Sequence, residues 1–277
     1  MRAREFTEAL APGAKQPLDL DKDDVIGLLK RDCPAYIQAA TALGNANWLC
    51  RGMKTSGDHS VYYGNSRQDR RPKDSTRWAN DLFDWCLKKL GFTALRGNSI
   101  FCTSDQDLAV DYGELYMIFP IDKASSYTYT KYDDVIIVGD IFVDMINDKK
   151  LEKLRDQVSY IIQHPEDYDD DPDLIRTTNL LWKGVRGIFE LMASAEGQEM
   201  LHDFQRKTGV SANIYDLVDV GKFEQEIHPN NSNLADGLRR QREVMISGEY
   251  YALREDDWWE TIRKEFQEDT RTYNREE

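Results

Sequence analysis

The sequence predicts an α+β fold, in which helices and strands occupy separate stretches of the chain. Helical periodicity is strongest near the N-terminus, in a long central block and in the C-terminal tail. Short apolar runs bounded by turn residues lie between these stretches and favour strands. The regular strand–helix–strand alternation of a doubly wound sheet is not found. We therefore expect a single domain over residues 1–277.

Composition indicates a folded protein of moderate size. The chain has 277 residues, of which 40% are hydrophobic, with 6 Trp, 14 Tyr and 10 Phe, so it has the aromatic surface that disordered chains lack. Its net charge of −14 disfavours nucleic acid as a partner. No apolar run approaches the ~20 residues that span a bilayer, so no membrane association is expected.

The chemistry-bearing residues exclude several familiar sites. The four cysteines have no CxxC spacing and predict free thiols in a reducing compartment, the cytoplasm. The histidines are scattered, and no P-loop, dinucleotide-binding glycine motif or nucleophile elbow is present. The run Asp169–Asp171 could hold a hard cation, but a solvated loop is the simpler interpretation, so no metal is expected.

The N-terminal third is expected to hold helices followed by a strand. Residues 1–45 form a helical arm in which Pro34 divides one helix from the next. A short apolar strand at 47–53 follows, and Lys54–Ser75 has the polar, glycine-containing composition of a long loop. Its basic segment Arg67–Lys73 is interpreted as a solvated part of that loop.

The remaining elements alternate between helical and strand patterns. In chain order we expect a helix at Arg77–Leu90, strands at Ile100–Cys102 and Leu115–Ile121, a tyrosine-rich loop at Lys123–Tyr132, a strand at Val135–Val138, helices at Leu151–Gln163, Leu174–Met192 and Glu199–Lys207, a strand at Asn213–Val220, two short strands within Glu243–Leu253 broken at Ser247-Gly248, and a tail helix from Glu255. The tail's Trp258, Ile262 and Phe266 would bury one face.

Three short motifs stand at the ends of three predicted strands. They are Arg51-Gly52, Phe101-Cys102-Thr103-Ser104, and Gln241-Arg242-Glu243-Val244-Met245-Ile246. Their order and form resemble the mono-ADP-ribosyltransferases of the arginine–serine–glutamate class, including phage-borne and bacterial effector members. The Ala-x-x-Tyr-Gly at Ala109–Gly113 is also similar to transferases of this group.

The resemblance implies a fold, a substrate and an activity. The fold would be an ADP-ribosyltransferase-like split β-sandwich with N-terminal helices and a helical insertion at 148–207. The substrate would be NAD, and the activity would be transfer of ADP-ribose to a macromolecule, with a protein acceptor favoured, in the cytoplasm of the producing or a host cell. A non-enzymatic interaction protein on the same fold and an NAD glycohydrolase remain alternatives.

The resemblance also assigns roles to residues. Glu243 would stabilise the oxocarbenium-like ribose, although an exposed strand-end carboxylate is the simpler interpretation. Arg51 would meet the pyrophosphate or ribose, or form a surface ion pair. Gly52 would admit the nicotinamide amide close to the backbone. Thr103 and Ser104 would orient Glu243 and line the nicotinamide site, and could also cap the following helix.

Three further residues complete the expected site. Tyr127 and Tyr129 fall where the family has a flexible loop with an aromatic cover for the nicotinamide, with core packing as the alternative. Gln241 occupies the position that selects the acceptor, and the acceptor's identity stays open. Cys102 departs from the family, which has serine there, and a thiol is a weaker hydrogen-bond partner for Glu243.

Overall fold

A computed structural model of the chain describes residues 11–42, 47–54, 59–70, 76–131, 139–168 and 171–273. The chain forms two compact units. The sheet unit comprises Met1–Arg71, Gly91–Val135 and Pro229–Glu277, and the helical unit comprises Pro72–Leu90 and Ile136–His228. The helical stretch expected at 148–207 lies within the second unit, which is larger because it also takes in residues on either side of that stretch and an earlier helix.

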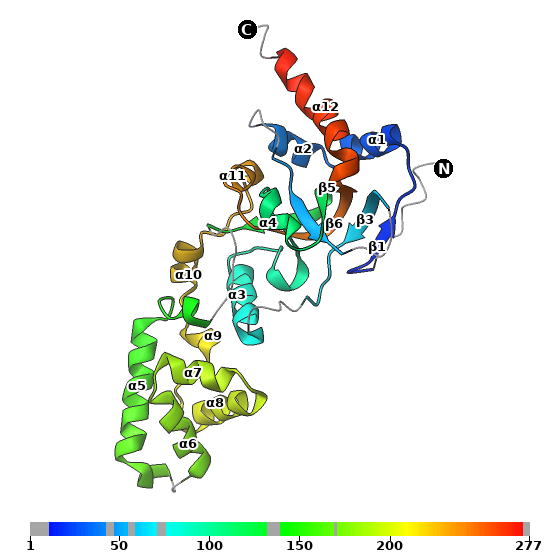
Figure 1. The fold of residues 1–277 in the computed structure, drawn as a ribbon. Helices are drawn as coiled ribbons and strands as arrows, with labels where there is room; N and C mark the ends of the chain where they lie inside the picture. Colours follow the sequence, from blue (N-terminus) through cyan, green and yellow to red (C-terminus); the bar gives the residue numbers. More distant parts are fainter. Residues whose placement is uncertain are drawn as a thin grey trace. The chain divides into compact units, whose positions relative to one another are not determined.

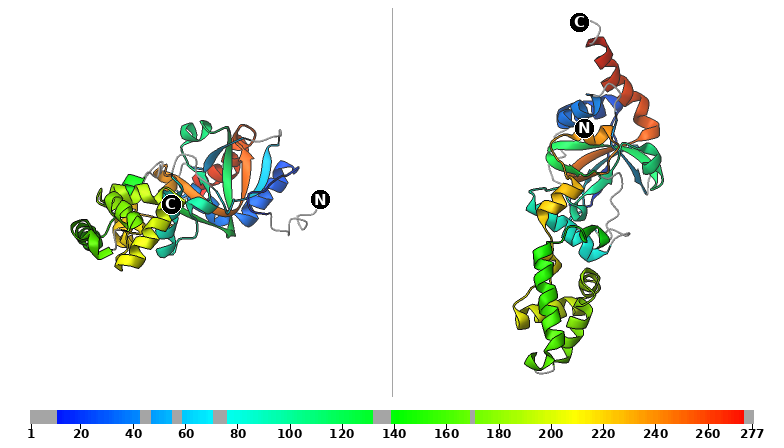
Figure 2. Two further views of the ribbon diagram at one scale, coloured as in Figure 1. Left: turned by 90° about the horizontal axis from the view of Figure 1, so that it is seen from below. Right: turned by 90° about the vertical axis from the view of Figure 1, so that its left-hand side faces the viewer.

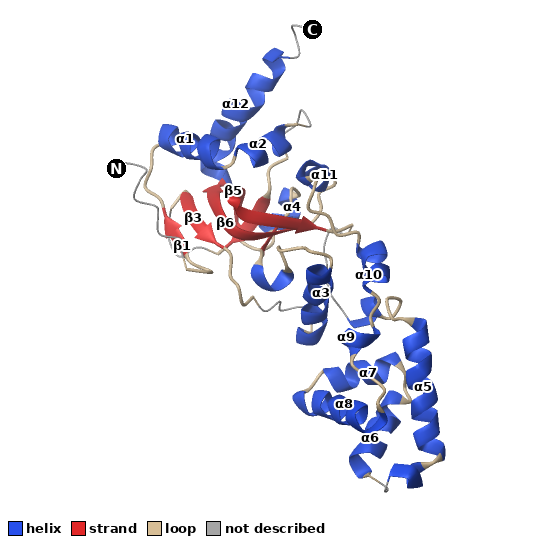
Figure 3. Cartoon of the chain, turned by 180° about the vertical axis from the view of Figure 1, so that it is seen from behind, coloured by secondary structure: helices blue, strands red, loops and turns tan. Residues whose placement is uncertain are grey.

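The described residues of the sheet unit form one antiparallel sheet of six strands (Figure 3). The strands are β1 (Lys15–Pro17), β2 (Cys50–Met53), β3 (Val61–Asn65), β4 (Ile100–Cys102), β5 (Glu114–Tyr129) and β6 (Val244–Arg254). Their order is β1-β3-β6-β5-β2, and β4 also pairs with β6. Strand β5 follows one edge of β6, while β4 and β3 share the other edge, at Val244–Ile246 and Glu249–Leu253 respectively. Strand β6 is therefore the centre of the sheet.

Strands β5 and β6 are longer than their sequences suggest. Residues 123–129 of the tyrosine-rich segment predicted as a loop belong to β5, and the two short strands predicted around Ser247-Gly248 are one strand, β6. The pairing of β5 with β6 slips between Pro120 and Ser125, opposite Gly248, whose φ is +106°. A side chain at position 248 would collide with the Ala124 carbonyl. Glycine thus lets a bulge continue the strand where sequence alone suggested a break.

Three helices cover one face of this sheet (Figures 2 and 3). They are α1 (Lys22–Asp32), α2 (Pro34–Thr41) and α12 (Glu255–Tyr273). The predicted division at Pro34 is confirmed, because Pro34 is the first residue of α2. Trp258, Ile262 and Phe266 of α12 are buried as predicted. The sheet unit also has two short helices, α4 (Gln106–Val110) and α11 (Leu234–Arg239), and the 3-10 turn η1 (Arg96–Asn98).

Other elements differ from the sequence-based expectations. Lys54–Ser75 contains strand β3, and the arm contains strand β1, both of which are short and lie among turn residues. The prediction of a strand at Asn213–Val220 is wrong, because this segment contains a short helix, Ile214–Leu217. The Asn213 side chain caps this helix by accepting from the Tyr215 N–H, 3.0 Å away. The strand expected at Val135–Val138 lies outside the described residues.

The helical unit contains seven helices among the described residues. They are α3 (Arg77–Lys89), α5 (Asp148–Gln163), α6 (Pro172–Leu181), α7 (Val185–Met192), α8 (Ala195–Thr208), α9 (Ile214–Leu217) and α10 (Val220–Ile227), with 3-10 turns η2 (Gly139–Phe142) and η3 (Pro165–Tyr168). Helices α5 to α8 pack against one another (Figure 1). Phe83, Phe142 and Phe223 are fully buried and contribute to its core.

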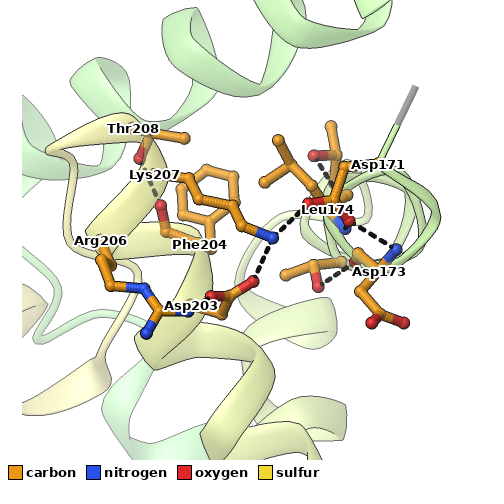
Figure 4. A network of polar contacts seen from close by, with 10 residues as sticks. Asp171, Asp173, Leu174, Asp203, Phe204, Arg206, Lys207 and Thr208 are labelled. Atoms are coloured by element: carbon orange, nitrogen blue, oxygen red, sulfur yellow. Dashed lines mark hydrogen bonds and ion pairs between the residues drawn. The ribbon is translucent and has the colours of Figure 1, made fainter. Parts of the chain in front are cut away.

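One member of the acidic run has a structural partner. The Asp171 carboxylate accepts from the N–H groups of Asp173 and Leu174, at 3.0 and 3.1 Å, and so caps α6 (Figure 4). It also pairs with Lys207 of α8, whose ammonium lies 2.5 Å from Asp203. Asp169 and Asp170 lie outside the described residues. Within the described ranges no cluster of His, Cys, Asp or Glu is grouped to hold a metal, and no helix is long and apolar enough to cross a membrane.

Candidate active site

The end of β4 brings two of the three sequence motifs next to each other. Cys102 lies opposite Val244 of β6, and the residue after it, Thr103, forms an isolated bridge with Cys50 of β2. The two N–O distances of that bridge are 2.6 and 3.0 Å. Strand β4 therefore contacts both the strand that bears Arg51 and the strand that follows Glu243.

The hydroxyls of Thr103 and Ser104 bind the backbone that precedes Glu243. Ser104 Oγ donates to the carbonyl of Leu238 over 2.6 Å, and Thr103 Oγ1 donates to that of Gln241 over 3.3 Å. Thr103 Oγ1 also accepts from the Asp105 N–H at 3.0 Å. The cap of α4 is Asp105 itself, whose side chain accepts from the Leu108 N–H, so the prediction that Thr103 or Ser104 caps this helix is wrong. Both hydroxyl-to-carbonyl hydrogen bonds end on the backbone of the turn that leads to Glu243. The pair fixes the approach to Glu243 rather than the carboxylate directly.

That approach is a defined helix ending. After α11, the Gln241 N–H donates to Leu238 O over 3.1 Å and the Arg242 N–H donates to Gly237 O over 3.0 Å. This pattern is a Schellman motif, which places one residue in the left-handed conformation. Gln241 is that residue, with φ +54°, and its side chain is exposed. The candidate acceptor-selecting residue thus sits at the tip of a rigid turn.

Glu243 is not an exposed strand-end carboxylate. It immediately precedes β6, its side chain is only 19% exposed, and its Oε2 lies 3.7 Å from Nη1 of Arg96. The Arg96 side chain is 9% exposed. A cationic partner stabilises the charged form of a partly buried carboxylate, because burial by itself disfavours that form. Arg96 supplies that partner.

Three arginines contact Phe101, two at its ring and one at its backbone carbonyl. The guanidinium carbons of Arg70 and Arg96 lie 3.7 and 4.8 Å from the ring centroid. Arg51 donates from Nη1 to the Phe101 carbonyl over 2.9 Å. We call Arg51, Arg70 and Arg96 the arginine cluster. Stacking on an aromatic face suits a guanidinium because the ring's π-face is electronegative.

The arginine cluster is a region of concentrated positive charge in an acidic protein. Burial, together with the charges of Arg51 and Arg96, lowers the pKa of Arg70 to about 10. Burial and then the Arg51 charge lower the pKa of Lys15, on β1. The negative charge of Glu243 has the opposite effect and raises the pKa of Arg70. The cations therefore repel one another, and a carboxylate offsets only part of that repulsion.

Ser66 holds the loop after β3 against the turn that bears Arg96. Its hydroxyl donates to the Asn98 carbonyl and accepts from the Gly248 N–H, both at 2.8 Å. The Arg70 N–H donates to the Gly97 carbonyl, also over 2.8 Å. These bonds tie the loop to η1 and to the bulge of β6. Arg70 and Arg96 are consequently positioned by backbone contacts, independently of any ligand.

Gly52 and Cys102 are packed against the protein's own chain. A Cβ at Gly52 would lie 2.8 Å from Gly113 N and closer still to the Ala109 carbonyl oxygen. The space beside this glycine is therefore filled by the segment after α4. Cys102 is 2% exposed, and burial raises the pKa of its thiol to about 12. The thiol is neutral at physiological pH.

Tyr127 and Tyr129 lie in β5, not in a loop. They pair with Ile246 and Val244, positions that alternate along β6 with Met245, the partner of Phe101. Successive residues of a strand point to opposite faces, so both tyrosines are on the face opposite Phe101. Tyr129 is buried there and donates to Asn233 O over 3.1 Å. Tyr129 therefore packs in the core, which was the alternative to a role as an aromatic cover for the nicotinamide.

The structure thus groups Arg51, Thr103, Ser104 and Glu243, and it adds two arginines that sequence reasoning missed. Arg70 was within the basic segment interpreted as a solvated loop; its neighbours Arg67 and Asp69 are indeed exposed, but Arg70 is half-buried. The available signal for Arg96 was its Arg-Gly pair just before a strand, the same form as Arg51-Gly52. Comparisons of the chain with protein-family models, with curated proteins and with solved structures find no match.

Proposed function

We propose that this protein transfers ADP-ribose from NAD to a macromolecular acceptor, on an ADP-ribosyltransferase-like split β-sandwich. One observation carries the proposal: the partly buried carboxylate of Glu243 lies against Arg96, within the arginine cluster. The chain's net charge of −14 favours a protein acceptor over a nucleic acid.

The chemistry of NAD calls for this combination of charges. The reaction breaks the bond between the ribose C1′ and the nicotinamide nitrogen, and both bonding electrons leave with nicotinamide. The ribose then resembles an oxocarbenium ion, which a nearby carboxylate stabilises. The acceptor nucleophile forms a new bond to C1′ and releases a proton. Two phosphates travel with the ribose, and guanidinium groups bind phosphate oxygens well.

The backbone around Glu243 supports a fixed carboxylate. Thr103 and Ser104 anchor the turn before it, and β6 pairs on both edges directly after it. Electrostatic catalysis works best when the stabilising group needs no reorganisation during the reaction. Glu243 is therefore the residue to which we assign the stabilisation of the ribose cation, with Arg51 and the Thr103-Ser104 pair shaping the NAD site.

Release of nicotinamide from NAD by the purified protein tests the enzymatic proposal. Glu243→Gln keeps the side-chain shape and removes the charge, and we expect it to slow release about 100- to 1,000-fold. Glu260→Gln, at an exposed carboxylate of α12, is the matched control and should release nicotinamide at the wild-type rate. No release from the wild type, or equal release from Glu243→Gln, would show that the protein is not this enzyme.

A second measurement separates transfer from hydrolysis. NAD labelled in the adenosine half is incubated with the protein and a cell lysate, and the label is followed into macromolecules and into free ADP-ribose. Transfer predicts label on a protein that is absent with Glu243→Gln. Nicotinamide release with all of the label in free ADP-ribose would instead identify an NAD glycohydrolase.

A further inference from the structure

We infer that the arginine cluster is an anion site that receives the pyrophosphate of the dinucleotide, with Arg70 and Arg96 binding it beside Arg51. The identity of the ligand as a dinucleotide rests on the proposed function. The presence of an anion site rests on geometry alone, so the two can fail separately.

The first support is convergence from separate segments. Arg51 comes from β2, Arg70 from the loop after β3, and Arg96 from η1, yet all three contact Phe101. A guanidinium that stacks on a ring uses its flat face and keeps its N–H edge for a ligand. The edges of the fork match phosphate oxygens in pairs. Phe101 thus acts as a platform for phosphate-binding groups.

The second support is an unsatisfied donor. Among the residues that the structure describes, Nη1 of Arg70 is buried and has no hydrogen-bond partner. Burying a charged donor without a partner costs considerable free energy, so such groups commonly mark a ligand site. The hydrogen bonds of Ser66 and the Arg70 backbone hold this segment in place. The backbone of Arg70 is thus fixed by hydrogen bonds, and its guanidinium is held against the Phe101 ring.

The third support is the charge balance. Burial is the main cause that lowers the pKa of Lys15 and Arg70, and neighbouring cations add to it: Arg51 acts on both groups, and Arg96 acts on Arg70 as well. Glu243 opposes them with a single negative charge. A bound pyrophosphate would bring two more negative charges at neutral pH. A compact anion fits this site better than a nucleic-acid backbone, because the protein as a whole, at −14, repels long polyanions.

Isothermal titration with three probes tests the site. The probes are inorganic pyrophosphate, ADP-ribose, and nicotinamide riboside, which lacks phosphate. We expect the wild type to bind the first two, more weakly as salt rises, and to bind the third far less tightly. Absence of binding by both pyrophosphate and ADP-ribose would overturn the inference, as would equal affinity for the riboside.

Three substitutions at two positions of one loop locate the site. Arg70→Gln should weaken ADP-ribose binding about 10- to 100-fold, since a charged hydrogen-bonding partner is lost. Arg67→Gln, three residues earlier at a position whose side chain is 63% exposed, should change the affinity less than about twofold and is the control. Arg70→Lys keeps a charge but not the fork, and should fall between wild type and Arg70→Gln. Equal effects at positions 67 and 70 would contradict the site.

Glu243→Gln separates this inference from the proposed function. The variant should still bind pyrophosphate while failing to release nicotinamide. If the wild type binds pyrophosphate but does not cleave NAD, the anion site would be supported and the proposed enzymatic activity would be disproved. If Arg70→Gln cleaves NAD with an unchanged KM, the proposed enzymatic activity would stand and the anion site would be disproved.

Discussion

At the scale of single residues, Cys102 contributes to the packing of the core and not to the hydrogen bonds of the candidate site. Cys102 is buried on the face of β4 opposite Phe101, where it belongs to the apolar core. The hydroxyls that reach the turn before Glu243 come from the two residues after it. The transferases that the sequence resembles have serine at this position. Cysteine in its place removes none of the hydrogen bonds described for the site.

Cys102→Ser should accordingly destabilise the protein without impairing the proposed reaction. A buried hydroxyl without a partner costs about 1–3 kcal/mol, so we expect the free energy of unfolding to fall by that amount in urea titration. Cys102→Ala, which adds no polar group, should cost less. Nicotinamide release per folded molecule should stay within about twofold of wild type. A serine variant that is more active or more stable than wild type would place this position at the site after all.

At the scale of elements, helices that depend on local sequence patterns were predicted better than strands that depend on pairing with distant segments. The helices on either side of Pro34 and the helix at Arg77–Leu90 were predicted from periodicity and local signals such as Pro34, which act within a few positions. Strand β3 and the full lengths of β5 and β6 were missed, because a strand's stability depends on partners far away in the chain. The convergence of Arg70 and Arg96 on Phe101 was invisible for the same reason: it depends on how the loop bearing Ser66 joins η1 and β6.

The turn before Glu243 gives a prediction at this scale. Gln241 adopts a left-handed conformation that costs a non-glycine residue about 1–2 kcal/mol, so Gln241→Gly should raise the free energy of unfolding by up to about 1 kcal/mol. Arg239→Gly, two residues earlier inside α11, should lower it by about 1 kcal/mol. Urea denaturation of both variants measures the difference. Equal destabilisation by the two glycines would mean that the Schellman turn does not form in solution.

At the scale of the whole molecule, the site belongs to one of two compact units. A ligand bound to the sheet unit stabilises only the state in which that unit is folded. Saturation with ADP-ribose at 100 times its dissociation constant should therefore slow amide hydrogen exchange in β4 and β6 by up to about 100-fold. Exchange in α5 to α8 should change little. Equal protection of both units, measured by mass spectrometry, would indicate that they unfold as one.

The central position of β6 also governs when the sheet can be completed during synthesis. Strands β3, β4 and β5 emerge from the ribosome before their common neighbour β6, which begins at Val244. The helical unit is complete by His228. Because domains tend to fold as units while the chain grows, the helical unit can close first. The sheet and the arginine cluster it assembles must wait until β6 has been synthesised, so a message cut short before β6 yields a polypeptide without the candidate site.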